Sequence, residues 1–138
     1  MASIIKEVLI DARPDDVWAA VRDFGALHER LVPGFVVNCR LDGPDVRIVP
    51  FFNGAEAREI LVGIDDTARR LAYSVTDSPM GFAHSSASAQ VFDEGERHTR
   101  FVWITDLLPD ELATGTAQLM ERGIGVIKTT METRIAST

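Results

Sequence analysis

The sequence predicts an α+β fold in which one antiparallel sheet carries helices on a single side. Three observations indicate this: a strand-like start followed at once by helical segments, then six closely spaced β-rich runs, and finally one long helical segment. Short connections between strands favour hairpins, because a parallel crossover needs a dozen or more residues. Helices gathered before and after the strands can then cover one face of the sheet.

The first third of the chain is expected to open with a strand and two helices. Residues 3–11 are rich in Ile, Val and Leu and predict a strand. Pro14 suits the first position of a helix, where its missing N–H costs nothing, and two aspartates follow it at the positive end of the helix dipole. A second short helix over residues 26–32 is predicted to end at the Pro-Gly pair that comes next.

The middle of the chain predicts six strands separated by turn signals. The runs cover residues 35–41, 46–52, 55–64, 70–76, 82–92 and 98–108. From Pro109 onward, apolar residues recur at three- and four-residue spacing, which predicts a helix of about 25 residues, nearly 38 Å long. A helix of that length can cross a whole curved sheet and leave space beneath it.

Three glycines in the predicted C-terminal helix, Gly115, Gly123 and Gly125, withhold side-chain volume from the space under the sheet. Inside a helix, glycine costs about 1 kcal/mol relative to alanine, so each position needs a reason. Close packing of the helix on the sheet and the opening of a cavity are both compatible with this pattern.

Composition limits the classes of protein to which this chain can belong. The 138 residues are expected to form a single domain, spanning 1–138. With 14 basic and 21 acidic residues and no basic patch, no nucleic-acid partner is expected. The single cysteine cannot form an internal disulfide, and the three histidines lack metal-ligand spacing, so neither metal nor cofactor is expected. No signal peptide or membrane-spanning run is found, which predicts a cytoplasmic protein that does not insert into membranes.

Three stretches of the sequence follow the pattern of one superfamily. Residues 8–18 resemble its opening strand and a helix start that ends in Val-Trp, and residues 57–74 resemble its stretch with Arg-Glu, paired aspartates and Leu-x-Tyr-Ser. Residues 99–103 are similar to its last strand, which begins with Thr and ends with Trp. In this order and spacing, the chain resembles the START/Bet v 1-like (helix-grip) superfamily, the polyketide cyclase/dehydrase and lipid-transport group.

The chain departs from the family pattern at two places. Residues 31–36 keep the proline before the second strand but lack the usual tryptophan, and the Gly-x-x-Arg motif before the third strand is blurred over residues 43–47. These departures leave the subfamily, and with it the ligand, open.

The resemblance implies a helix-grip fold: a curved antiparallel seven-stranded sheet wrapped around a long C-terminal helix, in the order β-α-α-β-β-β-β-β-β-α. It also implies a hydrophobic cavity between sheet and helix, in which family members bind lipids, hormones or polyketides. Some members cyclise or dehydrate what they bind. Since fold alone does not decide among these activities, the site residues must.

Two lines of reasoning disagree about which face of the strand over residues 82–92 lines that cavity. Alternation alone places the less polar set, which includes Ser85 and Ala87, on the inner face. Alignment with hormone-receptor-like members places His84 and Ser86 there instead, and our prediction follows the alignment. The ligand-binding residues implied by the resemblance are Ala57, Glu59, His84, Ser86, Ser88, Val102, Ile104, Thr116, Leu119, Met120, Gly123 and Ile127.

Glu59 and His84 form the sharpest predicted constellation. A carboxylate and an imidazole that both face an apolar cavity could orient a ligand hydroxyl or carbonyl, or act as an acid/base pair in a cyclisation or dehydration. The alternative is that Glu59 pairs with an arginine on the sheet surface while His84 is half exposed.

Two turn-rich segments carry large apolar residues that a solvated loop would not need. They contain Phe51 and Phe52 in the first segment, and Pro79, Met80 and Phe82 in the second. By analogy with related receptors, we expect gate loops at the opening of the cavity. Simple capping of the core by the two hairpins explains the same residues.

Three functions remain open at this point. The leading interpretation is binding of a small hydrophobic molecule, such as a lipid or polyketide. The first alternative is a polyketide cyclase/dehydrase-type enzyme with Glu59 and His84 as its acid/base pair. The second is an interaction protein with a side-chain-filled cavity, acting through partner proteins or as a homodimer. A cavity above roughly 300 Å3 in which His84 and Glu59 face each other favours the first two functions, and a collapsed cavity favours the third.

Overall fold

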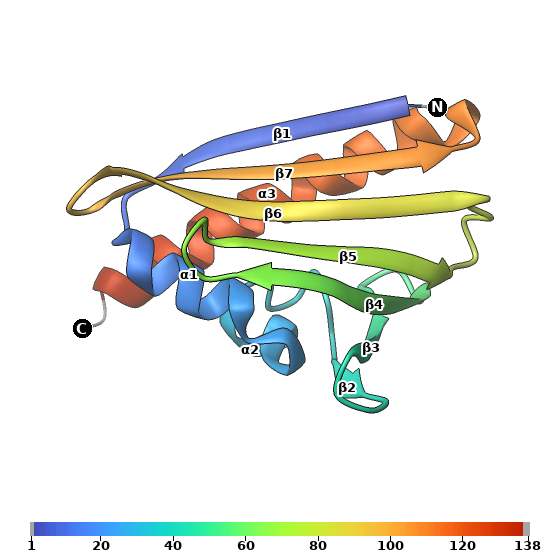
Figure 1. Ribbon diagram of the computed structural model, residues 1–138, viewed down its shortest axis with the longest axis horizontal. Coiled ribbons are helices and arrows are strands. Elements are labelled where there is room, and N and C mark those ends of the chain that lie inside the picture. Colours follow the sequence, from blue (N-terminus) through green and yellow to red (C-terminus); the bar gives the residue numbers. More distant parts are fainter. Residues whose placement is uncertain (1, 137–138) are drawn as a thin grey trace.

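The computed structural model describes residues 2–136, and the side chains of residues 2–134. Its elements are β1 (Ala2–Ile10), α1 (Pro14–Arg22), α2 (Leu27–Arg30), β2 (Arg40–Leu41), β3 (Val46–Pro50), β4 (Glu56–Asp65), β5 (Arg70–Asp77), β6 (His84–Gly95), β7 (His98–Leu108) and α3 (Ala113–Ala136) (Figure 1). Short 3-10 turns precede α2, at Phe24–Ala26, and α3, at Asp110–Leu112.

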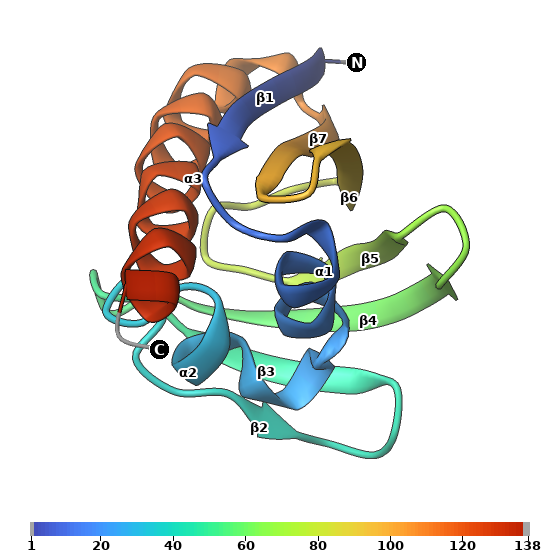
Figure 2. The same ribbon diagram turned by 90° about the vertical axis from the view of Figure 1, so that its left-hand side faces the viewer.

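The strands form one antiparallel seven-stranded sheet in the order β1-β7-β6-β5-β4-β3-β2. Figure 2 shows the sheet curling from β1 to β2, with α3 along its concave side and the two short helices at one end. The predicted α+β helix-grip architecture and its order of elements are therefore confirmed. The C-terminal helix has 24 residues, close to the length that its apolar spacing predicts.

The predicted strand over residues 35–41 is wrong for most of its length. Only Arg40–Leu41 pairs in the sheet, in register with β3. The preceding segment passes beneath the sheet, and Phe35 and Val36 are 5% and 2% exposed in the core. The apolar residues that suggested a strand are thus buried by tertiary packing. Val36 forms an isolated antiparallel bridge with Phe51, the residue that follows β3.

The predicted inner faces of β6 and β7 are also wrong. On β6, Ser85, Ala87 and Val91 are buried beneath the sheet, in agreement with the alternation that the alignment overruled. On β7, Phe101 and Thr105 are buried on the same side. A shift of one residue moves every side chain of a strand to the other face, so an alignment with distant relatives that is one position off reverses the whole assignment.

Two hydrogen bonds fix α1 to the turn between β4 and β5. The Trp18 indole Nε1 donates to Asp66 Oδ1 at 2.9 Å, and Arg22 Nε donates to the same oxygen at 2.8 Å. Asp66 lies in the turn between β4 and β5. Two of the motifs that identify the superfamily, Val-Trp and the paired aspartates, therefore contact each other and orient α1 against the sheet.

The glycines of α3 serve different purposes. A Cβ at Gly123 would lie 3.1 Å from the Trp103 ring and 3.2 Å from the Phe35 ring, so glycine allows the helix to approach both. A Cβ at Gly115 or Gly125 would meet nothing within 4 Å. Close packing therefore explains the middle glycine, and Gly115 borders open space.

Candidate functional site: a cavity between the sheet and α3

A cavity of about 350 Å3 lies between the inner face of the sheet and the first half of α3. Its lining is mostly apolar and comes from β4, β5, β6, β7 and α3 together with the loops beside them. A second cavity of about 80 Å3 lies next to it, towards α2. The two share Phe35, Phe51, Glu59, Tyr73 and Trp103, which form the junction between them.

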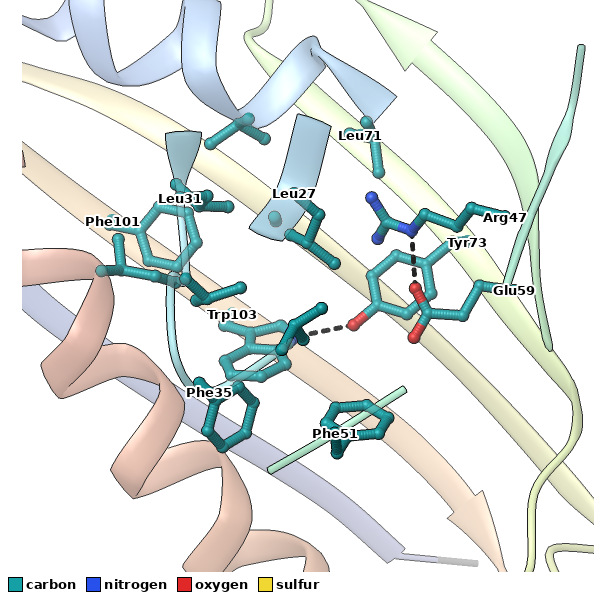
Figure 3. Close-up of a pocket in the computed structure, with 15 residues that line it drawn as sticks. Leu27, Leu31, Phe35, Arg47, Phe51, Glu59, Leu71, Tyr73, Phe101 and Trp103 are labelled. Carbon is teal, nitrogen blue, oxygen red and sulfur yellow. Dashed lines mark hydrogen bonds and ion pairs between the residues drawn. The ribbon is translucent and has the colours of Figure 1, made fainter. Parts of the chain in front are cut away.

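The junction contains a buried ion pair. Arg47 Nε donates to Glu59 Oε1 at 2.8 Å, and the two side chains are only 5% and 8% exposed (Figure 3). The guanidinium also donates from Nη1 to the Phe24 carbonyl at 3.2 Å and lies over the Phe24 ring at 4.1 Å. Arg47 and Glu59 are opposite each other in the register of β3 and β4, so both reach the inner face at one point.

Sequence reasoning placed Glu59 correctly beneath the sheet but missed its partner. The alternative interpretation expected an arginine on the sheet surface, whereas Arg47 is buried. Arg47 occupies the arginine position of the blurred Gly-x-x-Arg motif. That motif, combined with the strand register, is the signal from which the pair could have been found.

A second polar contact crosses the junction. The Trp103 indole Nε1 donates to the Tyr73 hydroxyl oxygen at 3.1 Å (Figure 3). Burial raises the pKa of Tyr73, and the negative charge of Glu59 raises it further. The phenol therefore keeps its proton and can donate it to an acceptor in the cavity.

Thr116 contributes a polar atom from the helix side. Thr116 lines the larger cavity, and its hydroxyl is itself buried and has no hydrogen-bond partner among the described residues. Buried polar groups are normally paired, so a hydroxyl left alone in a cavity wall needs an explanation.

His84 does not join this site. Its side chain is exposed, and its Nε2 lies 3.3 Å from the Ser86 hydroxyl on the opposite face of the sheet. The predicted Glu59–His84 pair is therefore absent, because β6 presents the other set of side chains to the cavity. The same reversal places Ser86, Ser88, Val102 and Ile104 outside the two cavities beneath the sheet.

Six of the other predicted residues line at least one of the two cavities. Those that line the larger cavity are Ala57, Glu59, Thr116, Leu119 and Met120. Ile127 lines the smaller cavity. Gly123 lines neither cavity and is buried against Trp103 and Phe35.

The predicted gate segments border one end of the larger cavity. Phe51, Met80 and Phe82 are among its lining residues. The ring of Phe52 faces outward and lies 3.8 Å from the Arg122 guanidinium of α3. Pro79 is exposed and is not part of the lining.

Two further properties concern metals and membranes. Within residues 2–134, His, Cys, Asp and Glu side chains nowhere gather in a group of three or more that could hold a metal ion. None of the helices described in the structure combines the length and the apolar character needed to cross a membrane.

An apolar cavity enclosed by a curved sheet and a long C-terminal helix defines the START/Bet v 1-like class of helix-grip proteins. The chain belongs to the polyketide cyclase/dehydrase and lipid transport family, whose model matches residues 1–132. No curated protein matches the sequence.

Solved structures support the same class. An uncharacterised protein from Bacillus thuringiensis superposes with a TM-score of 0.84 at 19% identity, covering 94% of this chain and 98% of that one. The di-domain aromatase/cyclase BexL of the BE-7585A biosynthetic pathway gives 0.82 at 14% identity, covering 96% of this chain and 47% of BexL. Norcoclaurine synthase from Thalictrum flavum gives 0.74 at 16% identity, with coverages of 99% and 87%. At these identities the likeness is one of fold.

Proposed function

We propose that the protein binds a small hydrophobic molecule in the cavity between the sheet and α3. The observation that carries this proposal is the cavity itself, about 350 Å3 of mostly apolar space. At the volume that one water molecule occupies in the liquid, this is room for roughly a dozen non-hydrogen atoms. A ligand of one or two rings, or a short lipid chain, matches that size.

Small residues keep this space open. Ala57, Ala87 and Gly115 line the cavity at positions where leucine or phenylalanine would fill it. Empty apolar space forgoes the dispersion contacts of a packed core, so a sequence optimised for stability alone would fill it. The retention of small side chains on both walls supports a ligand as the normal occupant and argues against a side-chain-filled interaction module.

The polar groups at the junction support binding over acid/base chemistry. Glu59 is held by Arg47 at 2.8 Å, and His84 lies on the other face of the sheet. The pair suggested for an enzyme of this family is therefore not available here. An ion pair that is fixed in place suits the orientation of a ligand better than the movement of a proton.

The segments around Phe51 and Met80 are the proposed opening to the cavity. Both contribute lining residues at the same end, and the first is attached to α3 through Phe52 and Arg122. Movement of this contact would admit a ligand without disturbing the strands.

Native mass spectrometry of freshly purified protein tests the proposal. We expect a bound species of small mass on the wild-type protein and its loss in an Ala87→Leu variant, whose longer side chain occupies the cavity. Ser86→Leu, at the adjacent position on the outer face of β6, is the matched control and should retain the bound species. Equal retention in both variants would contradict binding at this cavity.

A further inference from the structure

We propose that the larger cavity selects uncharged ligands that carry a hydroxyl or N–H donor at one end, and that it rejects anionic ligands such as fatty-acid carboxylates. This inference rests on the proposed function, because it concerns the polar end of the same cavity. It is built from Glu59 and Tyr73 at the junction and from Arg47, which lines the smaller cavity beside them.

Glu59 supplies a hydrogen-bond acceptor. Its side chain lines the larger cavity, and the recorded bond to its carboxylate, from Arg47, is made to Oε1 alone. A carboxylate has two oxygens with about four acceptor sites in all, so capacity remains on Oε2. In apolar surroundings, Oε2 is expected to accept a hydrogen bond from a donor group.

Tyr73 supplies a donor beside it. Its hydroxyl oxygen accepts from Trp103, and its own proton has no acceptor among the described residues. Tyr73 and Glu59 come from the neighbouring strands β5 and β4, both line the two cavities, and Figure 3 shows their polar ends on the same side of the sheet. A single ligand hydroxyl can donate to Glu59 and accept from Tyr73.

The positive charge of Arg47 does not line the larger cavity. Arg47 lines the smaller cavity only, and its guanidinium already bonds Glu59 and the Phe24 carbonyl and stacks over the Phe24 ring. The larger cavity therefore presents the carboxylate and hides the cation behind it. A ligand carboxylate would meet Glu59 with little water to separate two like charges.

Four probes that share one bicyclic ring separate the donor from the charge: naphthalene, 2-methoxynaphthalene, 2-naphthol and 2-naphthoate. Proton–nitrogen correlation NMR reports binding through the two indole N–H groups of the protein. Trp103 lines both cavities, whereas the indole of Trp18 is bonded to Asp66 at the other side of the fold and serves as an internal reference. Titration of the Trp103 signal gives a Kd for each probe.

We expect 2-naphthol to bind roughly tenfold more tightly than naphthalene or 2-methoxynaphthalene, the gain typical of one hydrogen bond to a charged acceptor. 2-Naphthoate should bind most weakly of the four.

Tyr73→Phe should reduce the preference for naphthol over naphthalene. The double variant Arg47→Met/Glu59→Leu, which replaces the ion pair with apolar groups and so avoids an unpaired buried charge, should bring that preference close to one. His84→Ala, on the outer face, should leave it at about tenfold.

The outcomes that overturn the inference are distinct from those that overturn the proposed function. Equal affinity for 2-methoxynaphthalene and 2-naphthol would show that the cavity does not recognise a hydrogen-bond donor. Binding of 2-naphthoate that is tighter than that of naphthalene would show that the cavity accepts anions. Either result overturns this inference and leaves the binding function standing. If none of the four probes shifts the Trp103 signal, both are overturned.

Discussion

Two buried threonines, one on β7 and one on α3, have hydroxyls in opposite situations. The Thr99 hydroxyl donates to the Ala12 carbonyl at 2.8 Å and holds the end of β1 against β7. Thr116 lines the cavity, and its buried hydroxyl has no partner among the described residues. The same group thus stabilises the fold at one position and costs stability at the other.

Replacing each threonine with valine, which is isosteric, measures this difference. In ligand-free protein we expect Thr116→Val to raise the free energy of unfolding by up to about 1 kcal/mol, because it removes an unpaired buried hydroxyl. Thr99→Val should lower it by about 1–3 kcal/mol, because it leaves the Ala12 carbonyl without its donor. Urea denaturation provides both values. A loss of stability in both variants would mean that the Thr116 hydroxyl already has a partner.

At the residue scale, sequence reasoning found the acceptor of the site and missed what surrounds it. Glu59 was predicted beneath the sheet, and it is there. Its partner Arg47 and the donor Tyr73 were not predicted as site residues, because both functions arise from distances across strands. Such distances depend on register and on the curvature of the sheet, which a single sequence does not specify.

Among the elements, α1 is held to the turn between β4 and β5 by the exposed carboxylate of Asp66, in addition to an Asp15–Arg69 ion pair and the packing of its buried face. Two hydrogen bonds hold the pKa of Asp66 below its usual range: the bond from Arg22 has the larger effect, and the bond from Trp18 the smaller. A carboxyl whose pKa is lowered in the folded state stabilises the fold above its ordinary pKa, and this contribution is lost as the pH falls through the lowered value.

An acid titration followed by NMR checks this attachment. We expect the Trp18 indole N–H signal to move with a midpoint below the usual pKa of an aspartate, as Asp66 takes up its proton. The Trp103 signal, whose acceptor is Tyr73, should stay in place over the same range. A midpoint for Trp18 at or above the usual aspartate value would contradict the contact with Asp66.

The glycines of α3 allow a second test at this scale. Gly125→Ala should raise the free energy of unfolding by about 1 kcal/mol, because alanine is the better helix former and its Cβ meets nothing within 4 Å. Gly123→Ala should gain less or lose stability, since its Cβ would press on Trp103 at 3.1 Å and on Phe35 at 3.2 Å. Equal gains in thermal or chemical denaturation would show that α3 does not need a glycine for its approach to the sheet.

The strands show where an element can be recognised and still be placed the wrong way round. Runs of β-forming residues predicted β6 and β7 well, and β7 at 98–108 matches its predicted bounds. The alternation of Ala and Val on β6 predicts the observed inner face, whereas alignment with distant relatives predicts the opposite one. For these strands the local pattern was the better guide, because burial acts on every second residue directly.

In the molecule as a whole, the order of elements could be predicted from the local sequence. The cavity could be predicted only from the resemblance to the superfamily. Hairpin spacing and the length of the last helix follow from local sequence, which is why the architecture could be predicted. The cavity is what remains after large side chains such as Phe35 and Trp103 have packed, and it is kept open by Ala57, Ala87 and Gly115. A volume of this kind is set by the whole core, so no single motif encodes it.

The central claim, that this space receives a ligand, is tested most directly by the indole N–H signals during titration with naphthalene. We predict a saturable shift of the Trp103 signal, an unchanged Trp18 signal, and loss of the Trp103 response in Ala87→Leu. A Trp103 signal that stays fixed at saturating naphthalene, or one that responds equally in wild type and Ala87→Leu, would contradict it.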